Sequence, residues 1–417
     1  MNQSRIRITY FHHGGAEGGA PLSLKYLVAS LEQDKYDIIV VNAGDEQSPG
    51  VNAMFEQLGI KTLNCQLPRF AHTTGGHYNL LKLSGWQKLL RWYRGYSSAK
   101  KRLERLIADV KPDIVHFNSL TLAPYASVPH ASGIPTVVHV RESVLKGAFG
   151  FRTSWLRKHL IMHASRVIAI CRDNLDRLGL PAGKGVVIYN PVPFAKFDFQ
   201  LSQDAARLKL GVPMDAKVVL MTMTATSTGK GAVPFIKAMQ QVIKTNNELW
   251  CLIPGLTIPA TPHPPINSIR RIVAFALGRY RNQTLLYALA NNGGLQGRII
   301  CCDFAADMEQ WIAAADIVCV PYTQPHFSRT LLEAGAMKKP VIASRVGGLE
   351  ECVQEGETGL LAPAGDAQAL ALAVERLLRN EQERKRMGGN NYQFVISKAD
   401  AALSAQCVMK VYDDLLA

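Results

Sequence analysis

The chain has 417 residues, more than a single hydrophobic core usually holds, so its length predicts two or three domains. Hydrophobic residues make up 47% of the sequence and charged residues 19%, which excludes an intrinsically disordered protein. The sequence contains no apolar run near the ~18 residues of a membrane-spanning helix, and its first residues have no apolar signal-peptide core.

The eight cysteines include no C-x-x-C spacing and mostly stand within apolar runs. That distribution is typical of reduced core cysteines, so we expect a cytoplasmic protein. A disulfide or metal role for the cysteines is the less favoured alternative.

A first strand is expected at residues 5–11, followed by a glycine-rich turn and a helix at residues 22–31. The turn contains Gly18 and Gly19, and such turns let the backbone approach a phosphate or a sugar closely. Its spacing is not G-x-G-x-x-G, which argues against a dinucleotide site. A tight turn without a ligand is the alternative.

Two further strands are expected at residues 36–42 and 60–63, before a strongly basic segment. Residues 80–105 contain eight lysines and arginines against one glutamate, so half of the net charge of +14 lies here. Leucines and tryptophans accompany the charge, which favours a helix on an anionic membrane surface. A solvated helix packed on the core is the alternative. No nucleic-acid motif accompanies the charge, so we expect no nucleic-acid partner.

The next strands are expected around residues 111–119, at 134–140, at 166–171 and at 185–190. His139 and Arg141 would point to the same face if their strand continued far enough. Pro191 and Pro193 then interrupt the pattern and predict a hinge. A strand at residues 217–223 begins the alternation of strand, loop and helix again, so the chain contains two similar α/β units.

A polar turn at residues 224–231 leads from that strand to a helix at 233–243 and contains Thr226 and Lys230. A lysine beside glycines at a helix start can neutralise a leaving diphosphate. An exposed loop lysine is the alternative. After a strand at 249–254, a proline-rich loop and a basic, apolar helix at 269–281 suit a membrane edge or an acceptor contact. A decorative insertion would explain them equally well.

Strands at 317–322 and 341–344 flank a helix whose first turn Ser328 can cap. The loop between the first strand and this helix leaves the carboxyl end of a strand, where open parallel sheets bind ligands. Gly347 and Gly348 repeat the arrangement after the next strand. Free amide groups at such helix starts favour phosphate. A last helix is expected within residues 391–416.

Residues 325–334, PHFSRTLLEA, resemble the nucleotide-binding signature of glycosyltransferase family four, which usually reads E-x-F-G-x-x-x-x-E-A-M-A. The stretch 339–344, the glycine pair, Glu351 and the stretch 356–361 continue the pattern in register. The resemblance implies the α/β GT-B fold, two Rossmann-like domains facing across a cleft. It implies an acceptor domain at residues 1–192, a donor domain at 193–399, and a final helix at about 400–417 that packs back on the first domain.

The resemblance also implies site residues for a nucleoside-diphosphate sugar, without metal or cofactor. Glu333 would accept hydrogen bonds from the ribose, and Lys230 would stabilise the departing diphosphate. Where the family usually carries His-Asp, this chain has Arg141-Glu142, with His139 two positions earlier. The candidate catalytic residues are Lys230, Glu333, His139 and Arg141. The candidate donor-binding residues are Gly18, Gly19, Thr226, Lys230, Phe327, Ser328, Arg329, Thr330, Glu333, Gly347 and Gly348.

The expected function is a retaining, metal-independent glycosyltransferase of cell-surface polysaccharide synthesis, with a glycan or lipid-linked acceptor. It would be cytoplasmic and attach to the inner face of the membrane through residues 80–105 and 269–281. Three family positions differ, with Pro325 for a glutamate, Ala225 for an arginine and Arg141 for a histidine. A nucleotide-sugar-binding subunit with little activity is therefore the alternative, and a hydride-transferring enzyme is a distant third.

Overall fold

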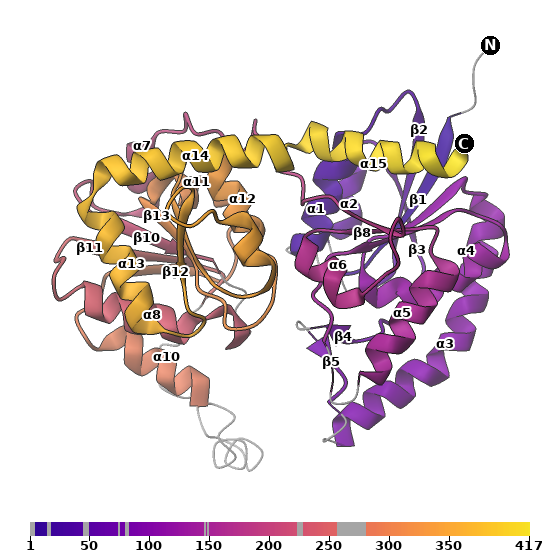
Figure 1. Ribbon diagram of the computed structural model, residues 1–417, viewed down its shortest axis with the longest axis horizontal. Coiled ribbons are helices and arrows are strands. Elements are labelled where there is room, and N and C mark those ends of the chain that lie inside the picture. The colour runs from indigo at the N-terminus through magenta and orange to yellow at the C-terminus, as the bar shows by residue number, and fades with distance from the viewer. Residues whose placement is uncertain are drawn as a thin grey trace. The chain divides into compact units, whose positions relative to one another are not determined.

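The structure is a computed structural model (Figure 1) that describes residues 5–14, 18–44, 50–73, 76–79, 83–145, 147, 150–222, 228–256 and 281–417. The chain divides into two compact units, one of Met1–Pro193 with Lys398–Ala417 and one of Phe194–Ser397. Each unit contains one large parallel sheet with helices packed against it. The predicted class, two α/β units with parallel sheets, is confirmed.

The sheet of the first unit has the strand order β3-β2-β1-β6-β7-β8-β9. The chain adds strands outward from β1 through β2 to β3 and then returns to the other side of β1 with β6. The order thus reverses between β1 and β6, and this switch point is where open α/β sheets bind ligands. The strands are β1 Ile6–His12, β2 Tyr36–Asn42, β3 Lys61–Asn64, β6 Ile114–Phe117, β7 Thr136–Val140, β8 Arg166–Ala169 and β9 Gly185–Val187.

Successive strand residues point to opposite faces, so two hydrophobic clusters form on this sheet. One cluster joins Ile8 and Val40 to α1, α2 and α15. The other joins Phe11 and Val41 to α3, η1 and α5. The helical elements of the unit are α1 Gly19–Ala29, α2 Val51–Glu56, α3 Leu83–Val110, η1 Leu120–Ala126, α4 Ser127–Ala131, α5 Phe151–His163, α6 Arg172–Leu178 and α15 Ala401–Leu416. A small hairpin, β4 His72–Thr73 with β5 Gly76–His77, was not predicted.

The sheet of the second unit has the order β12-β11-β10-β13-β14-β15 and reverses between β10 and β13. Helices α8 and α13 pack against one face of this sheet and share a hydrophobic core with it. Helix α11 contacts both α7 and α12. The strands are β10 Lys217–Met221, β11 Leu249–Pro254, β12 Ile299–Cys302, β13 Ile317–Val320, β14 Val341–Ser344 and β15 Gly359–Ala362. The helical elements are α7 Gln203–Leu210, η2 Thr228–Lys230, α8 Ala232–Val242, α10 Arg281–Asn291, α11 Met308–Ala314, α12 Arg329–Ala336, η3 Gly347–Cys352, α13 Ala367–Arg379 and α14 Glu381–Ala399.

The end of the chain contains the final helix that was predicted within residues 391–416, and a further helix, α14, comes directly before it. Two helices, α14 and α15, meet at Asp400, whose carboxylate accepts hydrogen bonds from the amides of Ala402 at 2.9 Å and Leu403 at 3.2 Å. This cap starts α15 at Ala401, within the range predicted for the final helix. Among the helices that the structure describes, none has both the length and the apolar character needed to cross a bilayer.

Candidate functional site

The predicted donor residues of the second unit lie on both sides of its switch point. The turn after β10 ends at Lys230, and the loop after β13 leads to α12. The amide of Thr323 donates to the carbonyl oxygen of Gly229 at 2.8 Å. The hydroxyl oxygens of Thr222 and Thr330 are 2.8 Å apart. These contacts tie the two loops together, although they are about 100 residues apart in sequence.

Gly231 allows the lysine turn to lie against the second loop. Its φ of +80° belongs to the left-handed region, and an added Cβ would lie 1.8 Å from the carbonyl oxygen of Pro321. Lys230 places its Nζ 5.2 Å from the centre of the Tyr322 ring, within the range of a cation–π contact. The glycine therefore fixes how closely Lys230 approaches the loop after β13.

The start of α12 differs from the prediction in one detail. Ser328 has the extended backbone of an N-cap residue, but its side chain makes no capping hydrogen bond. Its Oγ instead accepts a bond from the Tyr322 hydroxyl at 3.4 Å. The prediction that Ser328 caps the first turn is therefore wrong. Phe327 and Thr330, on either side, are buried.

Glu333 forms an ion pair with Arg329 one turn earlier on α12, between Arg329 Nη2 and Glu333 Oε1. The side chains are only 15% and 6% exposed. Because Arg329 is the first residue of α12, its positive charge lies at the end of the helix dipole that favours anions. Glu333 compensates this charge, and a bound anion would do the same.

Gly347 and Gly348 begin η3, directly after β14, and η3 contacts α12. Gly347 has a φ of +56°, which favours glycine. Lys230, the Arg329–Glu333 pair and the two glycines thus follow β10, β13 and β14, three neighbouring strands. Thr226 lies outside the described residues, and so do residues 269–280 of the basic helix predicted at 269–281.

Three polar side chains meet at the switch point of the first unit, and the sequence did not predict them as a site. His13 Nε2 lies 2.7 Å from Ser119 Oγ, which donates to Glu142 Oε1 at 2.6 Å. The amide of Leu120 donates to Glu142 Oε2 at 3.0 Å. Burial alone would raise the pKa of Glu142, but hydrogen bonds from His13, Ser119 and Leu120 outweigh it, so the pKa is lowered.

Arg141 and His139 lie in a buried network behind this cluster. Arg141 donates to the side-chain oxygens of Asn118 and Asn190, both at 2.6 Å. His139 Nδ1 is 3.4 Å from Arg141 Nη2 and 3.3 Å from His116 Nε2. Burial lowers the pKa of both histidines well below its ordinary value, and the charge of Arg141 adds to this. Both rings are therefore neutral.

His139 and Arg141 do lie on one side of the sheet, as their spacing predicts. Both are nearly inaccessible, 2% and 6% exposed. Their catalytic role stays a prediction. Gly18 precedes α1 and Gly19 begins it. Asn118 donates to the carbonyl oxygen of Ala20 at 3.3 Å, so the network reaches this glycine turn.

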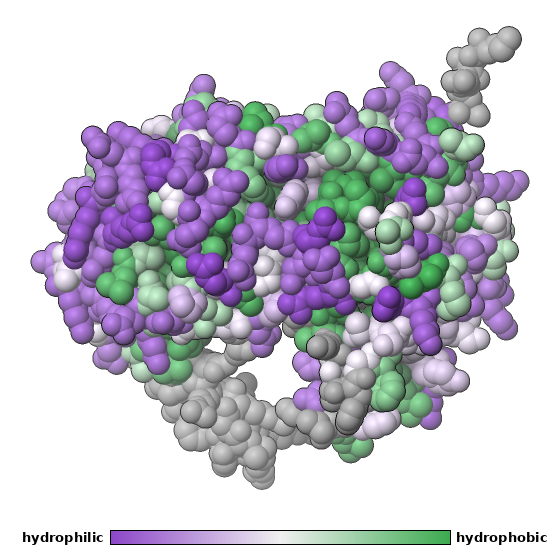
Figure 2. All heavy atoms as spheres, viewed as in Figure 1, coloured by the Kyte–Doolittle hydropathy of each residue, from purple (hydrophilic) through white to green (hydrophobic). Residues whose placement is uncertain are grey.

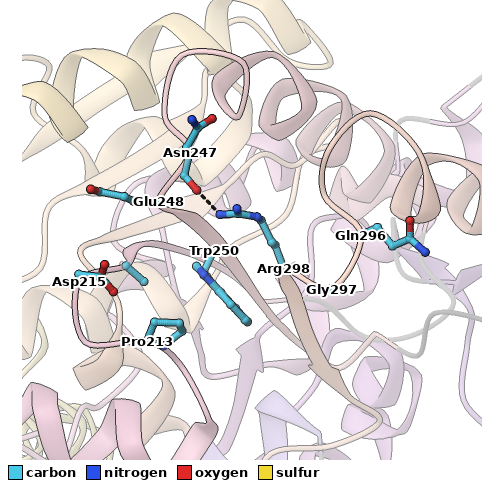
Figure 3. A pocket seen from close by; sticks show the side chains of 9 residues that line it. Pro213, Asp215, Asn247, Glu248, Trp250, Gln296, Gly297 and Arg298 are labelled. Atoms are coloured by element: carbon cyan, nitrogen blue, oxygen red, sulfur yellow. Dashed lines mark hydrogen bonds between the residues drawn. The ribbon is translucent and has the colours of Figure 1, made fainter.

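A cavity of about 430 Å³ opens at the other end of the second sheet (Figure 3). It lies beside Trp250 near the start of β11 and Arg298 just before β12. Arg298 donates to the carbonyl oxygen of Asn247, and the acidic side chains of Asp215 and Glu248 are at the rim (Figure 3). The carboxyl ends of the strands carry the predicted site, so this cavity is not part of it.

Two family models match the two halves of the chain. Residues 202–394 match "Glycosyl transferases group 1", and residues 18–191 match "Glycosyl transferase 4-like domain". The D-inositol 3-phosphate glycosyltransferase of Corynebacterium glutamicum is 29% identical over 245 residues, 58% of this chain and 53% of the relative. The lipopolysaccharide core biosynthesis glycosyltransferase LpsE of Rhizobium meliloti is 25% identical over 211 residues, 51% of this chain and 53% of the relative. The matched region is about half the length of these curated relatives.

The Anabaena protein HepE, solved in complex with UDP and glucose, has a similar fold. The TM-score is 0.76 at 20% identity, over 98% of this chain and 100% of that chain. The two parallel sheets, the paired family models and this likeness over the whole chain agree with one another. The chain therefore belongs to the glycosyltransferases of the family-four type, with the GT-B fold.

Proposed function

We propose that the chain transfers a sugar from a nucleoside-diphosphate sugar to a hydroxyl of a glycan or lipid-linked acceptor. One observation carries this proposal: the turn with Lys230 and the loop before the Arg329–Glu333 pair are joined across the switch point by the Gly229–Thr323 and Thr222–Thr330 contacts. A cation, a carboxylate and two glycine-bearing turns at one sheet edge suit a diphosphate joined to a ribose.

Glu333 would bind the ribose. Its ion pair with Arg329 uses Oε1, and a carboxylate can accept several hydrogen bonds. Lys230 would bind the diphosphate as a point charge, and Arg329 would supply the second positive charge. Arg329 thereby compensates for Ala225, which stands where the family typically has an arginine.

In our proposal the reaction needs no metal ion, because these two cations balance the charge of the diphosphate. The acceptor oxygen attacks the anomeric carbon on the face from which the diphosphate leaves, so the configuration is retained. The new C–O bond forms as the bond to the diphosphate breaks, and the leaving phosphate oxygen takes the proton of the acceptor hydroxyl. Lys230 and Arg329 stabilise the charge that develops on the diphosphate.

The similar proteins support the choice of donor and of acceptor class. HepE was solved with UDP and with UDP-glucose, which supports a uridine diphosphate sugar as the first donor to test. LpsE is named for lipopolysaccharide core synthesis, and this supports a role in cell-surface glycan synthesis.

We also propose that the first unit binds an anionic membrane surface. Phe70 connects α3 with α5, because its ring centre lies 5.0 Å from that of Trp92 and 5.1 Å from that of Trp155. Hydrophobic atoms are exposed among polar ones along the lower parts of these helices (Figure 2). The exposed apolar residues are Leu83, Trp86, Leu90 and Tyr93 on α3, and Phe151, Trp155 and Met162 on α5. Exposed lysines and arginines on both helices, such as Arg91 and Lys158, would meet the lipid phosphates.

A nucleotide-sugar-binding subunit with little activity is the second candidate. It is favoured by Pro325, which stands where the family's first glutamate holds the donor sugar. Turnover separates the two functions, because a binding subunit is stabilised by the nucleotide sugar but releases no product.

Thermal shifts with uridine, guanosine and adenosine diphosphate sugars test the donor site. Glu333→Ala should abolish the shift and Lys230→Ala should weaken it. The matched controls are Glu375→Ala, which breaks a similar helical ion pair with Arg379 on α13, and Lys237→Ala, which removes an exposed lysine of α8. Both controls should keep the shift. Unchanged shifts in the Glu333 and Lys230 variants would refute the site assignment.

A further inference from the structure

The cavity beside Trp250 lies at the amino ends of three strands of the second sheet, and we call it the Trp250 cavity. The strands β12, β11 and β10 are neighbours and run parallel, so their amino ends meet at one edge of the sheet. The volume of about 430 Å³ is within the range of ~300–1,000 Å³ that is typical of small-molecule sites. Residues that line the cavity include Pro213, Asp215, Asn247, Glu248, Trp250 and Arg298.

Hydrogen bonds hold the walls of the Trp250 cavity in place. The amide of Lys217 at the start of β10 donates to the carbonyl oxygen of Glu248 at 2.8 Å. The amide of Cys251 on β11 donates to the carbonyl oxygen of Arg298 at 2.9 Å. The side chain of Arg298 donates in turn to the carbonyl oxygen of Asn247. These bonds join all three strand starts, so a ligand does not have to order the cavity first.

Trp250 gives the cavity an aromatic surface. Its neighbours Leu249 and Cys251 belong to the hydrophobic core, whereas Trp250 is the one residue of β11 that is only partly buried. Figure 3 shows its side chain between Pro213 and Arg298. Within the described residues, the indole N–H has no hydrogen-bond partner. The C–H groups on the face of a sugar ring can pack against the negative face of an indole, and the N–H can donate to a ring oxygen.

The polar side chains of the cavity add acceptors and further donors. Asp215 and Glu248 are exposed, and neither carboxylate has an ion pair or a hydrogen bond to another described residue. Arg298 has more N–H groups than the one that it gives to Asn247. One arginine against two acidic residues gives the lining a net charge of −1, in a chain whose net charge is +14.

This combination of groups selects the chemistry of the ligand. A hydroxyl group both donates and accepts, so it can bind a carboxylate and an N–H group at the same time. A phosphate would meet the repulsion of two carboxylates, and a purely cationic ligand would leave the donors of Arg298 and Trp250 without an acceptor. An uncharged hydroxylated ring meets neither difficulty. The competing explanation is structural, with Trp250 covering the end of the sheet and the polar groups bonded to water.

We propose that the Trp250 cavity binds an uncharged sugar ring of a glycan, which stacks on the indole and donates hydroxyl protons to Asp215 and Glu248. The inference goes beyond the proposed function, because neither Lys230 nor Glu333 lines the cavity. Strands β10 and β11 have five and six residues, so at ~3.3 Å per residue the cavity lies roughly 15–20 Å from the donor loops. It holds the glycan away from the sugar that reacts.

Saturation-transfer NMR on the full chain tests the cavity, with glucose, galactose and N-acetylglucosamine as probes. We expect a signal for at least one probe with the wild type. Trp250→Ala removes the stacking surface and should weaken binding about 10-fold. The double variant Asp215→Asn with Glu248→Gln should weaken it about 10- to 100-fold, because charge-assisted hydrogen bonds are lost. Both carboxylates are exposed, so the double variant leaves the core unchanged.

Each variant has a matched control in the first unit. The double variant Glu32→Gln with Asp34→Asn removes two exposed carboxylates from the turn just before β2. Trp86→Ala removes a tryptophan of α3 that is 55% exposed. Both controls should bind the probe as the wild type does.

Three results would overturn the inference: no probe gives a signal with the wild type, Trp250→Ala binds as the wild type does, or the double carboxylate variant does so. Sugars that bound only at the donor edge would leave both cavity variants unchanged and would lose their signal in Glu333→Ala. The thermal shift with UDP, recorded on the same samples, should be the same in the cavity variants as in the wild type. If UDP gives no shift while the probe signal depends on Trp250 and the two carboxylates, the donor proposal fails and the cavity inference stands.

Discussion

The hydroxyl of Tyr412, near the end of α15, lies 2.6 Å from Nδ1 of His116 in the middle of the first sheet. The same hydroxyl lies 2.6 Å from that of Tyr10 on β1. His116 in turn contacts His139, which contacts Arg141. A hydrogen-bonded path therefore runs from the last helix through the sheet to Asn118 beside the glycine turn.

Tyr412→Phe should lower the free energy of unfolding by about 1–3 kcal/mol, because it leaves buried partners without a hydrogen bond. Tyr36→Phe is the control, since its hydroxyl lies 3.5 Å from Asp413 on the same helix and is not part of the network. Tyr36→Phe should lower the free energy of unfolding by less than about 1 kcal/mol. Urea unfolding measures both, and equal losses would contradict the importance of the buried path.

The stability of the chain should fall as the pH drops below about 6.5, the ordinary pKa of histidine. Burial lowers the pKa of His12 to about 4, with the charge of His13 adding to it, so only the unfolded chain takes up this proton between the two values. Within that window, each such histidine lowers the free energy of unfolding by about 1.4 kcal/mol for each pH unit that the pH falls. His12→Leu should reduce the slope of unfolding free energy against pH. An unchanged slope would show that His12 does not contribute.

Gly231→Ala should disrupt the donor turn, because the new methyl group would collide with the carbonyl oxygen of Pro321. Gly211→Ala is matched to it, since Gly211 has a φ of +72° and nothing lies within 4 Å of its Cβ position. The control should cost about 1 kcal/mol from backbone conformation alone. We expect a larger loss for Gly231→Ala, together with loss of the nucleotide thermal shift. Equal effects on both measurements would count against the close contact.

Arg329→Met should destabilise the ligand-free chain by on the order of 3 kcal/mol, because it leaves the buried carboxylate of Glu333 unpaired. The double variant Arg329→Met with Glu333→Gln should recover most of that stability, as neither charge remains. Nucleotide binding should stay weak in both. If the double variant binds a nucleotide sugar as the wild type does, neither side chain belongs to the donor site.

Leu90→Ser should weaken binding to vesicles that contain an anionic lipid, because Leu90 is one of the exposed apolar residues of α3. Leu208→Ser removes an exposed leucine of α7 in the second unit and should leave vesicle binding unchanged. Co-sedimentation with the vesicles measures both. The membrane proposal fails if the two variants behave alike.

Local patterns were sufficient for several strands and for the proximity of two of the residues predicted to bind the donor. The strands Tyr36–Asn42, Leu249–Pro254 and Val341–Ser344 have the predicted bounds, since each is a short apolar run between polar turns. Arg329 and Glu333 are one helical turn apart, so their proximity follows from the sequence itself.

The cluster of the first unit could not be predicted in the same way. His13, Ser119 and Glu142 come from three separate segments, and only the strand order shows that these segments are neighbours. The spacing of apolar residues along the chain does not show that the strand order reverses between β1 and β6. Helix α14 was not predicted separately from the final helix, because Asp400 ends α14 and caps α15 within an otherwise continuous polar and apolar pattern.

The position of α15 has a consequence for biosynthesis. The first unit contains Lys398–Ala417, whereas the whole second unit, Phe194–Ser397, is synthesised before that segment. The second unit is therefore synthesised in full while Tyr10 and His116 still lack Tyr412. In a chain truncated after residue 397, we expect protease resistance in the second unit and its loss in the first.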